Sequence, residues 1–236
     1  MLLLYIRHAD PIYSPDSITP LGERQAEAIG RRIARYGVDE IYASTSKRAQ
    51  MTAKPASEML KKEVVTSEIF LEDRVFTDFA IPGENGKRRW FWGIPKMKQL
   101  LSSPEVLQLG QEWYKHPELS QFEKGFMRIY DELDEFLLSK GYAHERGTGR
   151  YKIVEPSKRR TAIFAHAGYG VAFLSCLLDI PFPLVTLHFD LQPSGMIAIN
   201  FEDSESGYCI PRLLTYSNDA HLYAENIPAN RGKILF

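Results

Sequence analysis

Short apolar runs alternate with segments of helical character along the first seventy residues. Strands are predicted at 2–6, 39–44 and 64–71, separated by helices that start at Thr19-Pro20 and at Lys47. Threonine is a favoured N-cap, proline suits the first helical turn, and Gly37 is placed to end the first helix. Strands alternating with helices in this way are typical of an α/β fold whose parallel sheet is covered by helices on both faces.

The middle of the chain breaks this alternation, and the α/β pattern then resumes. From Asp73 to Gly149 there is helical periodicity interrupted by prolines and no convincing strand, with a clear amphipathic helix at 126–138. A strand at 161–165, a helix at 169–178 and strands at 196–201 and 212–216 follow. We predict a single α/β domain over 1–236, with three layers, a mostly parallel sheet and a helical cap insertion at 73–149 that acts as a lid.

Composition excludes several classes of protein. The 236 residues carry a formal net charge of −1, so no overall field attracts nucleic acid or a membrane surface. Cys176 and Cys209 are the only cysteines, which argues against a disulfide framework or a cysteine-based zinc site. The apolar N-terminus stops at Arg7 and is too short for a signal peptide or a membrane span. We expect a cytoplasmic protein, with a homodimer left open.

Two histidines follow predicted buried strands, in Arg7-His8-Ala9-Asp10 and in Ala165-His166-Ala167-Gly168. A histidine at a strand end is held at the rim of the sheet while its ring stays accessible. Neutral imidazole is a competent nucleophile near pH 7, and the arginine beside His8 offers a planar fork of donors that matches a phosphoryl group. The alternative is a hydrogen-bonded rim histidine next to a surface charge.

A second candidate element joins the strand at 39–44 to the helix that follows it. Ser44, Ser46 and the first helical amides can line an anion site, because helix N-termini favour negative charge. Arg48 lies in the first turn, where a cation opposes the helix dipole unless an anion or a carboxylate compensates. The alternative is that Lys47 and Arg48 form a solvated basic pair.

Taken together, four motifs resemble the histidine phosphatase superfamily, also called phosphoglycerate mutase-like. They are Arg7-His8, Ile18-Thr19-Pro20-Leu21-Gly22 with Gln25-Ala26, the Ser44–Ala53 segment of the form Ser-x-x-x-Arg-Ala-x-x-Thr-Ala, and Ala165-His166-Ala167-Gly168. The resemblance implies that His8 becomes phosphorylated and that Arg7, Arg48 and His166 bind the phosphoryl oxygens. His166 would add positive charge to the pocket if it is protonated. We also assign Ser14 to the phosphate-binding residues.

The chain departs from the family pattern in three places. Ala9 stands where the family usually has glycine, and Asp10 replaces the usual glutamate or glutamine. We expect ordinary backbone angles at Ala9, so that activity survives. The family's general acid follows its third strand, and Phe70-Leu71-Glu72-Asp73 is the closest match, although the residues that usually follow are absent. Glu72 is our choice for the acid, with Asp73 or Asp78 as alternatives, and burial or bound phosphate would keep it protonated.

The reaction that these residues predict is phosphomonoester hydrolysis through a phosphohistidine, without metal or cofactor, on a small phosphorylated substrate. It is the activity of a histidine acid phosphatase-type enzyme. The mutases of the family carry a Ser-x-Trp-Asn segment soon after the first histidine, which residues 10–14 lack, so hydrolysis is favoured over mutase-type phosphotransfer. Two other classes remain: a hydrolase with a metal bound by His8, His166 and a carboxylate, and a non-catalytic phosphate-binding module. Residues 88–92 of the insertion either contact the substrate or belong to its core.

Overall fold

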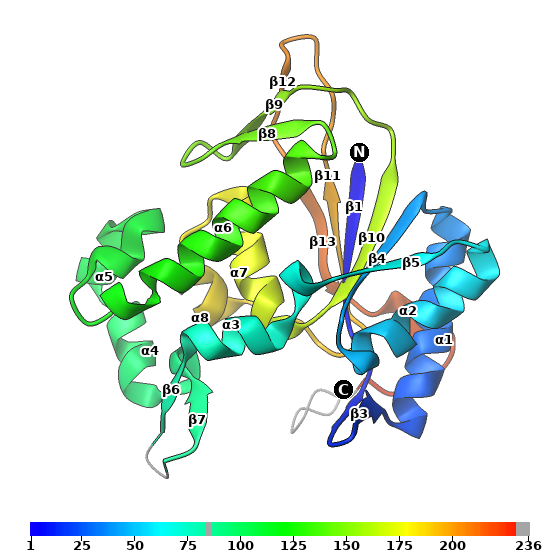
Figure 1. The fold of residues 1–236 in the computed structure, drawn as a ribbon, viewed down its shortest axis with the longest axis horizontal. Helices are drawn as coiled ribbons and strands as arrows, with labels where there is room; N and C mark the ends of the chain where they lie inside the picture. Colours follow the sequence, from blue (N-terminus) through cyan, green and yellow to red (C-terminus); the bar gives the residue numbers. More distant parts are fainter. Residues whose placement is uncertain (84–85, 230–236) are drawn as a thin grey trace.

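A central sheet of six strands, in the order β13-β11-β1-β10-β4-β5, organises the chain in the computed structural model, which describes residues 1–83 and 86–229 (Figure 1). The parallel strands are β1 (Leu2–Arg7), β10 (Arg160–Ala165), β4 (Glu40–Ser44) and β5 (Val64–Ser67). The antiparallel strands β11 (Met196–Asn200) and β13 (Arg212–Asn218) complete the other edge. The predicted mostly parallel sheet is confirmed.

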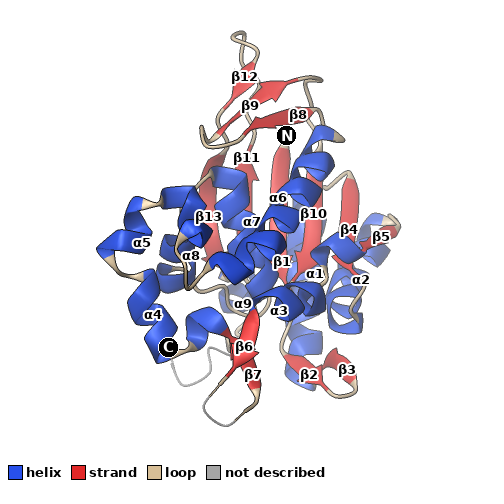
Figure 2. Ribbon diagram, turned by 60° about the vertical axis from the view of Figure 1, so that its left-hand side comes forward, coloured by secondary structure: helices blue, strands red, loops and turns tan. Residues whose placement is uncertain are grey.

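Helices cover both faces of this sheet, which confirms the three layers (Figures 1 and 2). One face carries α1 (Pro20–Tyr36) and α2 (Lys47–Leu60), with α9 (Ala220–Ala224) packed against α1; the other carries α3 (Glu72–Phe79), α6 (Glu123–Leu138), α7 (Ala167–Leu178) and α8 (Phe182–His188). Strand β1 is buried on both faces: Leu4 and Ile6 pack in the core with α1, and Leu3 and Tyr5 pack in the core with α6 and α7. This explains its continuous apolar run, since successive side chains of a strand point to opposite faces.

The segment between β5 and β10 is mostly helical, as predicted, but it also contains strands. Its further helices are η1 (Glu68–Phe70), η2 (Phe91–Gly93), α4 (Pro95–Leu101), α5 (Pro104–Gln108), η3 (Gly110–Lys115) and η4 (Ser120–Phe122). The short strands are β6 (Ala80–Pro82), β7 (Arg88–Trp90), β8 (Tyr142–Glu145) and β9 (Arg150–Ile153), with β12 (Tyr208–Cys209) added to β9. The prediction that 73–149 lacks strands is therefore wrong, because runs of three or four residues are too short to reveal a strand period.

The predicted domain 1–236 and cap insertion 73–149 include residues 84–85 and 230–236, which lie outside the described residues. Both assignments stay predictions. No helix in the described parts of the chain has the length and apolar character needed to cross a membrane.

Three candidate residues lie where neighbouring parallel strands end. His8 follows β1, His166 follows β10, and Ser44 closes β4, at the lower end of the sheet in Figure 1. Two hairpins, β2–β3 (Pro11–Tyr13 and Asp16–Ile18) and β6–β7, lie beyond this same end. Ligands of α/β proteins bind outside the carboxyl ends of the strands, so the fold directs attention to this edge.

Candidate active site

His8 is held with one ring nitrogen fixed and the other available. Its side chain is buried, and Nδ1 lies 2.7 Å from the carbonyl oxygen of Ala9. Because a carbonyl only accepts hydrogen bonds, Nδ1 must carry the proton, which leaves a lone pair on Nε2. Burial and then the charge of Arg7 lower the pKa of His8 to about 3. The ring is therefore neutral near pH 7, as a nucleophile must be.

Two guanidinium groups flank the histidine. Nη1 of Arg7 donates to the carbonyl oxygen of Leu191 at 2.6 Å, and Arg48, in the first turn of α2, is only 6% exposed. Nε of each arginine is buried and has no hydrogen-bond acceptor among the described residues. Arg48 is buried and Arg7 is partly buried, and two such cations that keep free Nε donors are suited to an incoming oxyanion.

Carboxylates offset the unfavourable position of Arg48 at a helix N-terminus. Nη1 of Arg48 donates to Oδ1 of Asp16 at 2.8 Å, and Nη2 lies 3.6 Å from Oε2 of Glu72. The two carboxylates compensate for the unfavourable interaction of Arg48 with the helix dipole, as expected from the sequence. Arg48 is therefore not the solvated basic residue of the alternative interpretation.

His166 faces His8 across the site, with ring centroids 5.2 Å apart. Its Nε2 lies 2.8 Å from Oγ of Ser44 and 3.2 Å from Oγ of Ser46. Nδ1 is buried without a hydrogen-bond partner in the described chain. Burial, then His8 and Arg48, hold the pKa of His166 well below its usual range. Without an anion the ring is therefore neutral, and a bound phosphoryl group would favour its protonation.

Glu72 is the one of the three candidate acids that lies beside the histidines. Its Oε1 accepts from the backbone N–H of Gly168 at 2.8 Å, and its Oε2 lies 3.8 Å from Nδ1 of His166. Burial raises the pKa of Glu72, against the opposing effects of the Gly168 hydrogen bond and the two arginines. Asp73 is exposed, and Asp78 forms an ion pair with Arg128 at 2.6 Å.

Ser14 is not brought to the site. It is exposed in the turn between β2 and β3, and no hydrogen bond joins it to any described histidine or arginine. The hairpin instead contributes Asp16, described above, and Tyr13, whose ring lies 5.4 Å below the Arg48 guanidinium carbon. The assignment of Ser14 to phosphate binding is therefore not supported, because the turn directs it to solvent.

Several residues that the motifs contained, but to which we gave no role, hold the loop after His8. Thr52 Oγ1 accepts from the N–H of Ala9 at 3.0 Å and donates to the Arg48 carbonyl at 2.7 Å, linking the segments that carry His8 and Arg48. Gln25 Oε1 accepts from the N–H of Asp10 at 2.9 Å. Gly22 is required because a Cβ there would lie 2.4 Å from the Asp10 carbonyl oxygen. The one sequence signal for these positioning roles is that Gly22, Gln25 and Thr52 belong to the quoted motifs.

Ala9 fits its position without strain. It is fully buried against Ile18 and Ala26, and it is not among the residues with positive φ. The expectation of ordinary backbone angles at this substitution is confirmed.

His8, Glu72 and His166 also present ligand atoms within 4.8 Å of one another, close enough for a metal ion. The surrounding charge opposes a cation, since Arg7 and Arg48 both lower the pKa values of the two histidines. The electrostatic field at this point favours an anion.

Comparison with known proteins agrees with the motifs. Residues 7–76 match the model of the histidine phosphatase superfamily, branch 1. The resemblance to this superfamily is confirmed. Solved structures of two phosphatases share the fold of this chain over nearly its whole length. A mycobacterial glucosyl-3-phosphoglycerate phosphatase superposes with a TM-score of 0.59 at 16% identity, covering 92% of this chain and 99% of its own. A phosphoserine phosphatase from Entamoeba histolytica, an H9A mutant in complex with phosphoserine, gives 0.58 at 17% identity, with 94% and 98% covered. No curated protein sequence matches the chain.

Proposed function

We propose that the protein is a phosphomonoester hydrolase that acts through a phosphohistidine and needs no metal, in the manner of the histidine acid phosphatases. The observation that carries this proposal is the fixed Nδ1 of His8, which leaves Nε2 as a neutral nucleophile between two arginines. The relatives described above, which are named as phosphatases, support the same reaction class.

In the first step the lone pair of His8 Nε2 attacks phosphorus and the P–O bond to the leaving group breaks. The electron pair goes to the leaving oxygen, which takes the proton of Glu72. Arg7 and Arg48 neutralise the non-bridging oxygens, and His166 donates to them once the anion has raised its pKa.

In the second step Glu72, now a carboxylate, takes a proton from water. The water oxygen bonds to phosphorus, and the P–N bond breaks with its electron pair returning to His8. The products are the alcohol and inorganic phosphate. A mutase would instead return the phosphoryl group to a bound product.

The test is turnover of p-nitrophenyl phosphate by the wild type and by His8→Ala. We expect the variant to lose at least about 10³-fold in kcat, as nucleophile removal does in other covalent enzymes. Wild type quenched in alkaline detergent should carry a phosphoryl group that is stable in base and lost in acid, and His8→Ala should lack it. Equal turnover by both proteins would end the proposal, and binding of phosphate without turnover would indicate a non-catalytic module.

The ligand-like cluster of His8, Glu72 and His166 makes a metal-dependent hydrolase the second candidate. Dialysis against EDTA separates the two mechanisms. We expect kcat to be unchanged within about twofold, because the proposed charge stabilisation comes from the arginines. Loss of activity that zinc or manganese restores would favour the second candidate.

A further inference from the structure

A cavity of about 330 Å³ begins beside the catalytic acid, and most of the residues that line it are apolar. It extends from the start of α7 toward η2 and the end of α8. The apolar side chains that line it include Trp90, Trp92, Val171, Leu187, Phe189 and Leu191.

Gly168 joins this cavity to the site of phosphoryl transfer. Its N–H binds Oε1 of Glu72, and it also lines the cavity. A Cβ built on Gly168 would lie 2.6 Å from Cζ2 of Trp90 and 2.9 Å from Oε1 of Glu72. The edge of the Trp90 ring and the proton donor therefore flank the same point. A leaving group whose oxygen is protonated by Glu72 would extend along Trp90.

The aromatic wall is held in place by its neighbours. Trp90 stacks on Trp92 with centroids 4.6 Å apart and planes 21° apart, and the ring of Phe76 meets Trp90 edge-on at 4.9 Å. Trp92 packs in turn against Phe182 at 5.6 Å. The β6–β7 hairpin that carries Trp90 lies next to α3, which carries Glu72 (Figure 2). A rigid indole surface of this kind favours a planar apolar ligand.

The charge of the lining further restricts which leaving group the cavity can bind. Its ionisable residues are Asp190 and His188, both exposed, and the described lining includes no arginine or lysine. Arg88, on the nearby hairpin, is directed elsewhere, since its Nη2 donates to the Thr77 carbonyl at 2.9 Å. A second anionic group on the leaving side would find no cation in the described lining, and it would meet the Asp190 carboxylate.

We propose that the cavity takes the leaving group of the substrate, and that this group is a planar aromatic alcohol without a second anionic group. The proposal rests on the phosphohydrolase function above and names its substrate class. It differs from the phosphoglycerate and phosphoserine chemistry in the names of the structural relatives, where the esterified group bears a carboxylate.

The test uses phosphonates, which bind without being hydrolysed, and measures dissociation constants by calorimetry. Methylphosphonate reports the phosphoryl site alone, benzylphosphonate adds a ring, and 4-carboxybenzylphosphonate adds a second anion. We expect benzylphosphonate to bind about tenfold more tightly than methylphosphonate, the effect of burying part of one ring. We expect 4-carboxybenzylphosphonate to lose most of that gain.

Two variants assign the effect to the cavity. Trp92→Leu keeps an apolar side chain but removes the stacked face, and should abolish the preference for benzyl over methyl. Asp190→Lys changes an exposed charge, so folding is not at risk, and should improve binding of the carboxybenzyl compound about threefold relative to the benzyl compound. Tyr223→Ala, at a side chain 90% exposed on α9, is the control and should change none of these ratios.

Equal binding of the methyl and benzyl compounds by the wild type would overturn the inference, as would equal binding of the benzyl and carboxybenzyl compounds. So would an unchanged benzyl preference in Trp92→Leu. Because these ligands need no turnover, an inactive protein with the expected preferences would contradict the proposed hydrolysis but leave the cavity assignment standing. An active protein without these preferences would contradict the cavity assignment but leave the proposed hydrolysis standing.

Discussion

Glu72 is subject to opposing influences on its proton. Burial raises its pKa, while the Gly168 N–H and the two arginines favour the ionised form, and burial prevails. Glu72→Gln removes the proton that the leaving oxygen needs, so kcat for phenyl phosphate should fall by about 10²–10⁴-fold. The loss with p-nitrophenyl phosphate should be smaller, because p-nitrophenolate leaves without protonation. Asp73→Asn, the same change at the exposed neighbour, is the control and should stay within about twofold of wild type. Equal losses with both substrates would contradict the acid role.

His8 and Glu72 together predict an acidic pH optimum. His8, with its pKa lowered to about 3, stays a neutral nucleophile down to that pH. Glu72 must be protonated, so kcat should fall as pH rises through its raised pKa. The pH profile of phenyl phosphate hydrolysis should therefore be highest on the acidic side. In Glu72→Gln the decline at higher pH should disappear, and its persistence there would show that another group causes it.

Among the elements, those with terminal signals were predictable. Helix α1 begins at Pro20 with the Thr19 side chain accepting from the Gly22 N–H at 3.0 Å, and ends at Gly37 with φ of 68°. The amphipathic helix predicted at 126–138 lies within α6, and the apolar residues of its inner face are buried: Phe126, Ile129, Tyr130, Leu133 and Leu137. The β6–β7 hairpin had no such signal. Its three-residue strands are stabilised by packing such as Phe76 on Trp90, which no local pattern reveals.

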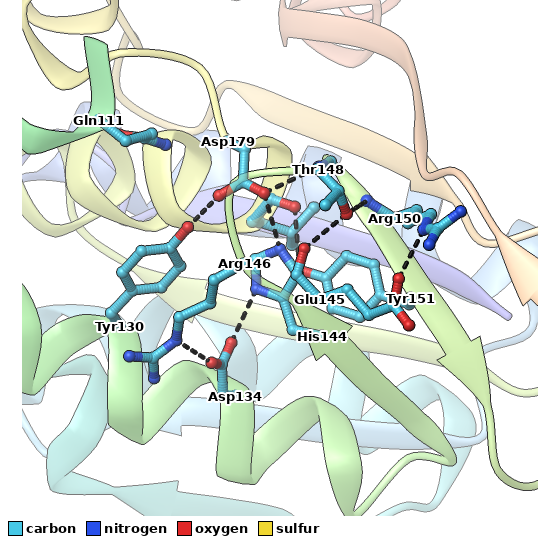
Figure 3. Close-up of polar contacts among 12 residues, drawn as sticks. Gln111, Tyr130, Asp134, His144, Glu145, Arg146, Thr148, Arg150, Tyr151 and Asp179 are labelled. Atoms are coloured by element: carbon cyan, nitrogen blue, oxygen red, sulfur yellow. Dashed lines mark hydrogen bonds and ion pairs between the residues drawn. The ribbon is translucent and has the colours of Figure 1, made fainter. Parts of the chain in front are cut away.

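A buried ionic cluster joins α6, the β8–β9 hairpin and the end of α7 (Figure 3). The His144 side chain is fully buried between two carboxylates, with Nδ1 at 2.9 Å from Asp134 and Nε2 at 3.2 Å from Asp179. The Tyr151 ring stacks on it at 4.2 Å. Tyr130 donates to Asp179, and Arg146 pairs with Asp134 at 2.6 Å. Sequence reasoning gave His144 no role, because its partners lie 10 and 35 residues away.

This cluster should make stability depend on pH. Burial alone would lower the pKa of His144, but the hydrogen bonds and charges of Asp134 and Asp179 raise it overall. The stabilisation is therefore complete below the unfolded pKa, about 6.5, and is lost as pH rises through the higher folded value. Relative to His144→Gln, the wild type should lose about 1.4 kcal/mol between pH 6 and pH 9 for each unit of that rise. Urea unfolding of both proteins at the two pH values measures it. His116→Gln, at a histidine outside this cluster, is the control, and a parallel response of wild type and His144→Gln would contradict the role of the cluster.

At the scale of the whole molecule, the fold class followed from the alternation of strands and helices. The central parallel strands β1 and β10 are buried on both faces and therefore read as continuous apolar runs. The candidate site could be predicted from the sequence only in part. Motifs placed His8, Arg7, Arg48 and His166, and the structure brings them together with Glu72. The hairpin contribution of Asp16 in place of Ser14 depends on how the β2–β3 turn is oriented, which is a tertiary property.

The described residues of the predicted insertion pack on the sheet rather than beside it, which predicts one cooperative unit. Trp113 is fully buried, stacks on Phe182 at 4.8 Å, and shares one core cluster with Leu3 of β1. All three tryptophans, at 90, 92 and 113, lie in residues 73–149, so their fluorescence reports the insertion while far-ultraviolet circular dichroism reports the whole chain. We expect the two urea transitions to coincide, as in two-state unfolding.

A core substitution remote from the insertion sharpens this test. Leu4 lies in the cluster on the opposite face of the sheet, with α1 and α2. Leu4→Ala should lower the free energy of unfolding by about 2–5 kcal/mol, because it leaves a cavity. If the chain is one unit, the fluorescence midpoint should shift as far as the dichroism midpoint, although no tryptophan lies in that cluster. Leu138→Ala, at a half-exposed residue, should move neither midpoint much. A fluorescence transition that stays in place while the dichroism transition moves would show that residues 73–149 unfold separately, and the single domain would have to be divided.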